Sequence, residues 1–314
     1  MVFKPFSFLF GKQKKEKIIL DTDIGSDVDD ALALLFGLKS PYISLDGITT
    51  VYGTTDVRAK ISRKIVDYTG RDIEIHAGEQ IGLHTPRIWH TGREGEGILT
   101  EEEFSKPLHE MKIGEQAVDY LIEKIMGSSK EYTIVAIGSL TNIARALLKE
   151  PRFQDNVKQL YIMGGVFGND YGREPEHNIY NDIKGAQIVL NSKIPITLFP
   201  LNITAQVPIL RDDFEQMQES EVSRSVKALV DVWFDYRDTI FGRRCEYTCM
   251  HDPLTLAAVV HPELVRTQMV HVDISRNGIT RLDKANGKNI KVATSVDYDK
   301  FREIFFGTIL RKEY

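Results

Sequence analysis

Short runs of β-branched and other apolar residues alternate along the chain with longer segments whose apolar residues recur at helical spacing. The short runs predict strands at residues 17–20, 43–50, 73–77, 132–137, 159–163 and 196–199. The helical spacing predicts helices at residues 31–38, 56–68, 114–126, 140–150 and 184–190. Because strand and helix alternate in this way in βαβ units, we predict an α/β fold with a mostly parallel sheet flanked by helices.

The same pattern predicts how the chain is divided. No linker rich in Pro, Gly or Ser interrupts it, so residues 17–314 are expected to form one α/β domain. Within this domain, residues 211–261 are expected to be helical, and a closing pair of strands and a helix should follow. Residues 1–16, in which a short apolar run precedes several lysines, are expected to form a flexible N-terminal arm.

Composition narrows the range of functions. The chain has 314 residues, of which 42% are hydrophobic and 27% charged, which excludes a disordered or fibrous protein. Its net charge of -5 provides no positive field for a nucleic acid or an anionic membrane, so neither is expected as a partner. Two cysteines, Cys245 and Cys249, form neither a disulfide framework nor a four-cysteine zinc site, and a cytoplasmic location is expected.

Polar and glycine-rich segments follow most of the predicted strands. These segments are DTDIGSDVDD, TTVYGTTD, GSLTN, MGGVFGND and PLNIT. The carboxyl ends of parallel strands meet at one edge of a sheet, where open α/β sheets bind their ligands. The chain is therefore expected to carry a ligand site at this edge.

The first of these segments, residues 21–30, contains five aspartates. Two carboxylates about 4 Å apart repel by roughly 4 kcal/mol at an effective dielectric constant near 20. Several of them converge only around a cation or by taking up protons. Oxygen ligands of this kind suit a hard ion, and a flexible loop with several carboxylates favours Ca2+ over Mg2+. The alternative interpretation is a set of solvated aspartates that cap the following helix and its turn.

Three other acidic or phosphate-binding motifs do not fit this loop. An EF-hand would require Gly at Ser26 and Glu at Leu32. A P-loop would require Gly-Lys-Ser/Thr, which is absent from the segment. A Mg2+-dependent phosphotransferase of the haloacid dehalogenase type would require Gly at Ile24 and Thr at Gly25. A phosphatase assay with Mg2+ would test that rival class directly.

Six motifs in order, DTDIGSDVDDALAL, TTVYG, GSLTNIARAL, MGG, PEHN and MHDPLTLAA, give the chain a wider resemblance. From about residue 17 to the C-terminus it resembles the inosine-uridine-preferring nucleoside hydrolase family. The resemblance implies a Rossmann-like α/β domain, a tightly bound Ca2+ and hydrolysis of the N-glycosidic bond of a ribonucleoside. It also implies a homo-oligomer, a dimer or a tetramer, whose substrate is a small nucleoside.

The resemblance further implies roles for individual residues. The expected metal ligands are the carboxylates of Asp23, Asp30 and Asp252 and the backbone carbonyl of Thr141. Asp23 is also expected to act as general base towards the attacking water, and His251 to protonate the departing base. The expected ribose-binding residues are Asp29, Glu176, Asn178 and, with an ambiguous register, Asn169.

Other aromatic and imidazole side chains suggest contacts with the substrate. His90 lies in a glycine-rich stretch, residues 88–99, that could close over the substrate as a lid. Trp233 belongs to an aromatic stripe on a predicted helix, which is either part of the core or supplies a ring that stacks on the nucleobase. His76, His109, His261 and His271 are interpreted as structural or surface residues.

The chain departs from the family pattern at several positions. The first motif of the family is usually two residues shorter, and the role of the inserted Asp27 and Val28 is open. Thr54 stands where the family usually has Asn, and His177 where it usually has Phe. These differences leave the choice of base open, and they also leave open a calcium-dependent binder of ribosyl compounds with little turnover.

Overall fold

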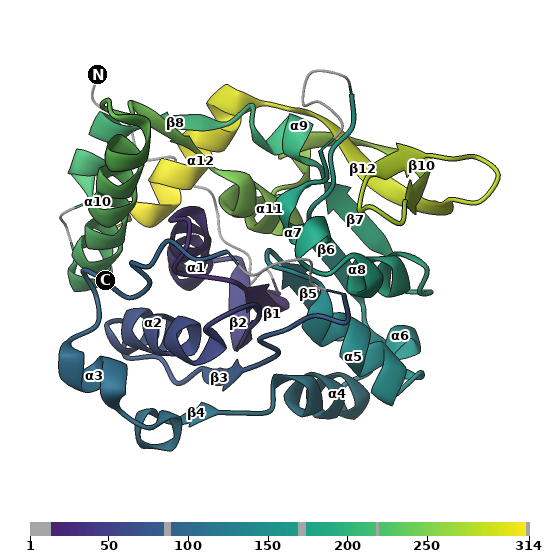
Figure 1. The fold of residues 1–314 in the computed structure, drawn as a ribbon, viewed down its shortest axis with the longest axis horizontal. Helices are drawn as coiled ribbons and strands as arrows, with labels where there is room; N and C mark the ends of the chain where they lie inside the picture. Colours follow the sequence, from purple (N-terminus) through teal and green to yellow (C-terminus); the bar gives the residue numbers. More distant parts are fainter. Residues whose placement is uncertain (1–13, 85–88, 169–173, 218–219, 312–314) are drawn as a thin grey trace.

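The structure is a computed structural model that describes residues 14–84, 89–168, 174–217 and 220–311. Its centre is a sheet that, in the described residues, has ten strands in the order β11-β10-β12-β7-β6-β5-β1-β2-β3-β4 (Figure 1). The strands are β1 (Glu16–Thr22), β2 (Ile43–Thr50), β3 (Glu74–Ala77), β4 (Ile113–Gly114), β5 (Tyr132–Ala136), β6 (Gln159–Met163), β7 (Ile196–Phe199), β10 (Val265–Ile274), β11 (Thr280–Leu282) and β12 (Lys288–Val296). From β12 to β4 neighbouring strands are parallel, and β10 pairs antiparallel with β11 and β12.

Helices cover both faces of this sheet because its central strands are apolar on both faces. In β1, Ile18 and Leu20 enter one hydrophobic core and Ile19 enters the other, as the alternation of side chains along a strand requires. The first core is covered by α1 (Asp29–Lys39), α2 (Thr55–Asp67), α10 (Glu221–Phe241), α11 (His251–Val260) and α12 (Tyr298–Ile309). The second is covered by α4 (Ala117–Gly127), α5 (Thr141–Lys149), α6 (Phe153–Asn156) and α8 (Ile183–Leu190).

Shorter elements complete the described chain. They are the helices α3 (Glu101–Ser105), α7 (His177–Asn181) and α9 (Leu201–Thr204), the 3-10 turns at Leu108–Met111, Arg211–Gln216 and Pro262–Leu264, and the strands β8 (Pro208–Leu210) and β9 (Tyr247–Cys249). None of the described helices is both long and apolar enough to cross a membrane.

The predicted fold class is confirmed. Several predicted elements need correction, in the second half of the chain and at the edges of the sheet. The segment 211–261 is not wholly helical, because β9 lies within it and pairs antiparallel with β8. The expected closing pair of strands is a set of three, β10, β11 and β12. The helix expected from residue 114 starts at Ala117, because Ile113 and Gly114 pair with β3 as β4. Of the proposed arm, residues 1–13 lie outside the described residues, and Glu16 already belongs to β1.

Candidate active site

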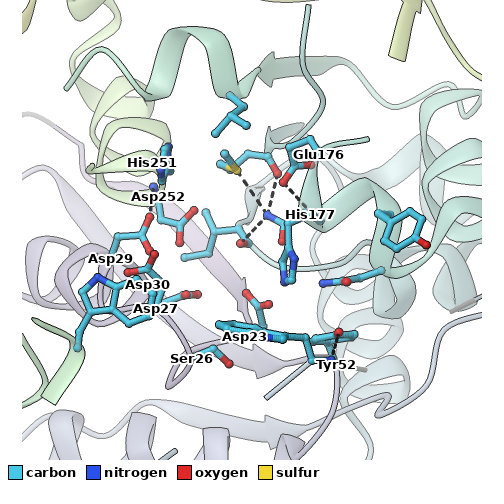
Figure 2. Close-up of a pocket in the computed structure, with 18 residues that line it drawn as sticks. Asp23, Ser26, Asp27, Asp29, Asp30, Tyr52, Glu176, His177, His251 and Asp252 are labelled. Atoms are coloured by element: carbon cyan, nitrogen blue, oxygen red, sulfur yellow. Dashed lines mark hydrogen bonds between the residues drawn. The ribbon is translucent and has the colours of Figure 1, made fainter. Parts of the chain in front are cut away.

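The loops that follow the parallel strands surround a cavity of about 480 Å³ at the carboxyl edge of the sheet (Figure 2). Its position is the one expected for a ligand site in an open α/β sheet. Among the described residues that line it, six are acidic: Asp23, Asp27, Asp29, Asp30, Glu176 and Asp252.

Three of these carboxylates form a tight group. Asp29 and Asp30 lie in the first turn of α1, and Asp252 lies in the first turn of α11. One oxygen from each carboxylate lies within 4.8 Å of the others, and all three residues are buried. The backbone N–H of Asp252 donates to Asp29 at 3.2 Å, and the hydroxyl of Thr22 donates to Asp30. Two helix N-termini therefore hold the group, and their dipoles favour negative charge.

The group is electrostatically unfavourable without a cation. Burial raises the pKa of Asp29, Asp30 and Asp252 well above the ordinary value, and the neighbouring carboxylate charges raise it further. Burial also raises the pKa of Asp27, to about 7. An oxygen-only set of buried carboxylates in this state fits a hard divalent cation, which would replace the protons.

Asp23 faces the same cavity from the loop between β1 and α1. Figure 2 shows its carboxylate pointing into the space that Asp29, Asp30 and Asp252 also face. Burial raises the pKa of Asp23, and the positive charge of Arg58 opposes this rise. Asp23 is thus placed beside the three-carboxylate group as a further acceptor of a proton or a ligand.

Glu176 and Asn178 lie at the start of α7. The carboxylate of Glu176 accepts hydrogen bonds from the backbone N–H groups of Gly165 at 2.9 Å, Asn178 at 2.7 Å and Ile179 at 3.1 Å. Burial raises the pKa of Glu176, and these N–H groups oppose the rise. The side-chain amide of Asn178 donates to the carbonyl of Ile137 at 3.0 Å. The helix start thereby fixes one acceptor and one amide in the cavity wall.

His251 immediately precedes Asp252 and also lines the cavity. Its Nδ1 lies 2.8 Å from the hydroxyl of Thr204, at the end of α9. Burial lowers the pKa of His251 to about 4, so the imidazole is neutral at neutral pH. With Nδ1 engaged by Thr204, the other ring nitrogen is the one available to a ligand.

Aromatic side chains form another part of the wall. The His177 ring lies edge-on to Tyr52 and Trp89, with centroids 6.0 Å and 5.8 Å away. The hydroxyl of Tyr52 accepts the backbone N–H of Trp89 at 2.6 Å. Trp233 of α10 also lines the cavity, and its Nε1 donates to Thr248 at 3.2 Å. Flat aromatic faces therefore lie next to the buried carboxylates. Such a cavity suits a ligand that has a polar part and an aromatic part.

Comparisons with known proteins decide the family. Residues 18–303 match the family model described as inosine-uridine preferring nucleoside hydrolase. The chain belongs to this family. It is 30% identical to a probable uridine nucleosidase 2 of Oryza sativa subsp. japonica, over 91% of this chain and 90% of that protein.

Solved structures agree with this assignment. A plant nucleoside hydrolase, PpNRh1, superposes with a TM-score of 0.80 at 28% identity, covering 95% of this chain and 99% of that one. A purine-preferring ribonucleoside hydrolase from Gardnerella vaginalis also has a TM-score of 0.80, at 26% identity, covering 94% and 98%. The predicted family, nucleoside hydrolase fold and enzyme class are thereby confirmed.

Not every residue predicted for this nucleoside hydrolase site lies at the cavity. Thr141 is not among the described residues that line it, and its hydroxyl donates to Asp182 at 2.8 Å. His90 is also not among them; its ring is exposed, with Nδ1 3.8 Å from Glu94. Asn169 lies outside the described residues, as does residue 88 at the start of the proposed lid.

Other residues of the nucleoside hydrolase cavity were not singled out from the sequence. Trp89 lies on its wall in place of its neighbour His90, and Ile137, the residue directly after β5, lies there in place of Thr141. Asn181, 2% exposed, also lines it, and no described residue bonds its amide nitrogen. Asn181 lies four residues after His177 in α7, so the two side chains share one face of the helix. This spacing is visible in the sequence and could have placed Asn181 at the site.

The buried carboxylate of Asp182 anchors the chain that leads towards Trp89. It accepts the backbone N–H groups of Leu83 and His84, each at 3.0 Å, and the hydroxyl of Thr141 at 2.8 Å. It also caps α8 by accepting the N–H of Gly185 at 2.9 Å. The aromatic part of the nucleoside hydrolase cavity is therefore tied to α5 and α8 by one residue.

Proposed function

We propose that this chain hydrolyses the N-glycosidic bond of ribonucleosides with the help of Ca2+, giving ribose and a free nucleobase. Asp23, Asp30 and Asp252 would hold the ion. The backbone carbonyl of Ile137 takes the place of Thr141 in this proposal, because Ile137 lies at the cavity wall. A bound calcium ion supplies Lewis-acid activation of water and a point of attachment for sugar hydroxyls.

The reaction needs a proton acceptor next to the water that attacks C1′. Asp23 fits this role, because its carboxylate faces the cavity and lies beside the three-carboxylate group. A carboxylate within hydrogen-bond reach of the water removes its proton as the carbon–oxygen bond forms. Because the base leaves from the opposite face of the sugar, this single displacement inverts the configuration at C1′.

The ribose would be held by groups from both ends of the cavity. Asp29, Glu176 and Asn178 are buried there and offer the acceptors and the amide that sugar hydroxyls require. Cleavage generates positive charge on the sugar ring, which nearby carboxylates stabilise. Contacts with ribose therefore lower the barrier as well as binding the substrate.

The departing base would occupy the aromatic part of the cavity. Tyr52, Trp89 and Trp233 offer flat faces there, and His251 offers a ring nitrogen on the side of the carboxylates. Since His251 is neutral at neutral pH, we propose that it supports the leaving base as an N–H donor. These aromatic residues are compatible with both purine and pyrimidine bases. Assays with a panel of nucleosides will define which base the enzyme prefers.

One observation carries this proposal: buried carboxylates from α1, α11 and the loop after β1 converge on a cavity that also holds Glu176, Asn178 and aromatic rings. Family membership gives the reaction class, and the convergence gives the parts that the reaction needs.

The test is an assay for free base across purine and pyrimidine nucleosides, with and without a calcium chelator. We expect release by the unmodified chain, loss of release with the chelator and recovery when calcium is added. Asp23→Ala should lower kcat by roughly 10²- to 10⁴-fold, the usual contribution of a general base. Asp155→Ala is the matched control, because Asp155 is exposed on α6 and should not affect release.

Different results would indicate other functions. Calcium-dependent nucleoside binding without release of base would indicate a binder, and release of phosphate with Mg2+ would indicate a phosphotransferase. Trapping of a covalent ribosyl-enzyme would contradict the single displacement. The expected homo-oligomer, a dimer or a tetramer, belongs to the same proposal and is checked by light scattering during gel filtration.

A further inference from the structure

Arg58, on α2, is a fully buried cation: its exposed fraction is 0%. Among the residues that the structure describes, it takes part in no ion pair. Removing an arginine from water without a paired carboxylate is unfavourable unless its donors are satisfied in another way. The donors of Arg58 must therefore be satisfied by uncharged acceptors.

The guanidinium instead donates to uncharged oxygens on two loops of the active site. Nε donates to the carbonyl of Tyr52 at 2.7 Å. Nη1 donates to the carbonyls of Asp23 and of Ile24, the latter at 2.9 Å. Nη2 donates to the hydroxyl of Ser26 at 3.0 Å. One side chain thus joins the acidic loop after β1 to the turn after β2.

Both loops need such a partner. The acidic loop, residues 23–28, carries Asp23 and Asp27 and turns at Gly25, whose φ is +112°. The turn after β2 passes through Tyr52, a non-glycine residue at φ +69°. Buried carbonyls in segments without ladder partners are unfavourable unless a donor reaches them, and Arg58 provides several donors.

We propose that Arg58 is a positioning residue that holds the acidic loop in the shape that binds the metal ion. The inference rests on the proposed function, because it assumes that Asp23 and its neighbours bind calcium. Arg58 itself does not touch the substrate; it acts through the backbone at Asp23 and Ile24 and through Ser26.

Two possible roles of Arg58 predict opposite effects on calcium binding. As a positive charge near the site, Arg58 repels a cation, so its removal would strengthen calcium binding. As a clamp on the loop, Arg58 keeps the ligands in place, so its removal would weaken calcium binding. The sign of the change therefore separates the clamp from the charge.

The experiment is a calorimetric titration of calcium into the full-length chain after removal of metal with a chelator. Arg58→Met keeps the length and apolar stem of the side chain and removes its donors. We expect its Kd for calcium to rise roughly 10- to 100-fold, the usual effect of replacing a residue that orients a metal ligand. Arg58→Lys, which keeps the charge but offers a single ammonium group, should recover part of the affinity.

Arg63 provides a matched control on the same helix. It is 5% exposed and, like Arg58, donates to backbone carbonyls, with Nη1 3.1 Å from the carbonyl of Ile73. The segment to which Arg63 donates contributes no described residue to the cavity wall. Arg63→Met should lower thermal stability without changing the Kd for calcium.

Each outcome decides the inference. Unchanged or tighter calcium binding by Arg58→Met overturns it, and so does equal weakening by Arg63→Met, which would show a general loss of stability. If circular dichroism shows that Arg58→Met does not fold, Arg58→Lys and Ser26→Ala take its place, and unchanged affinity in both overturns the clamp. Failure of the unmodified chain to bind calcium would instead overturn the proposed metal site, and the inference with it.

Discussion

The two sides of the cavity are built in different ways. The three-carboxylate group of one side lies in first helical turns: Asp29 and Asp30 belong to α1, and Asp252 to α11. The aromatic side takes two of its rings from connections, Tyr52 in the turn after β2 and Trp89 in the long segment between β3 and α3, and the rings of His177 and Trp233 from α7 and α10. Carboxylates that must meet within a few ångströms thus lie on rigid elements, whereas Tyr52 and Trp89, which we propose contact the base, lie where sequence can change with less consequence for the fold.

Among the tests of this comparison, replacement of Trp89 should have the largest effect on activity. If Trp89 stacks on the base, Trp89→Ala loses about 1–3 kcal/mol of stacking, which raises KM by roughly 5- to 150-fold. The rise should be larger for purines, whose rings offer more surface, while kcat changes little. Steady-state kinetics on a nucleoside panel measures both quantities. Phe104→Ala, at an exposed aromatic residue of α3, is the control. An equal fall in kcat for every base would place Trp89 among the packing residues instead.

Thr204 tests the boundary between the two sides, where we propose that His251 contacts the leaving base. Thr204→Val keeps the shape of the side chain but removes the hydroxyl 2.8 Å from Nδ1 of His251. Loss of one such hydrogen bond is worth about 0.5–1.5 kcal/mol, so kcat for nucleosides should fall roughly 2- to 10-fold. A riboside with a nitrophenol leaving group needs no help to depart, and its kcat should not change.

The outcome for Thr204 is clear in either direction. Thr204→Ser, which keeps the hydroxyl, should restore nucleoside turnover. A similar fall for the nitrophenyl riboside and for nucleosides would mean that Thr204 only supports the fold.

The smallest effect concerns the stability of the metal-free protein, in which Asp27 lines the cavity and Asp21 lies buried in β1. Burial raises the pKa of Asp21 and of Asp27 to about 7, above the value of either residue in the unfolded chain. Such groups favour the folded state at low pH, and this contribution is lost as pH rises from about 4 through 7. The Tm of the chelator-treated protein should therefore fall by several degrees over this range.

Thermal melts at a series of pH values measure this fall. Added calcium should oppose the part of the fall that comes from carboxylates in the cavity, because the ion replaces their protons. Asp27→Asn should make the curve flatter, since its amide does not ionise. A Tm that stays constant or increases with pH in the chelator would show that these carboxylates are not under the strain that burial implies.

The sequence predicted the fold well where elements were long and regular. The run at 43–50 and the run at 159–163 match β2 and β6 at both ends. It failed for β8, β9 and β11, which have three residues each, because such a short strand shows no alternation and is held by its partner.

The site was predicted unevenly for a physical reason. The carboxylates could be found because five aspartates in ten residues are conspicuous, and resemblance to a family connected them to Asp252. Trp89 could not be found, since an isolated aromatic residue in a loop has the same sequence signature whether it packs or binds. Arg58 could not be found either, because the carbonyls that it bonds are brought to it only by the fold.

The anchoring role of Asp182 bears on any attempt to alter the base that this enzyme accepts. A foreign loop transplanted between β3 and α3 would dock only if it presented two consecutive backbone amides at positions 83 and 84 to that carboxylate. It would also need glycine at position 82, where a β-carbon would come within 2.5 Å of the Asp182 side chain. Grafts that respect these three positions could exchange the aromatic surface while leaving the three-carboxylate group untouched.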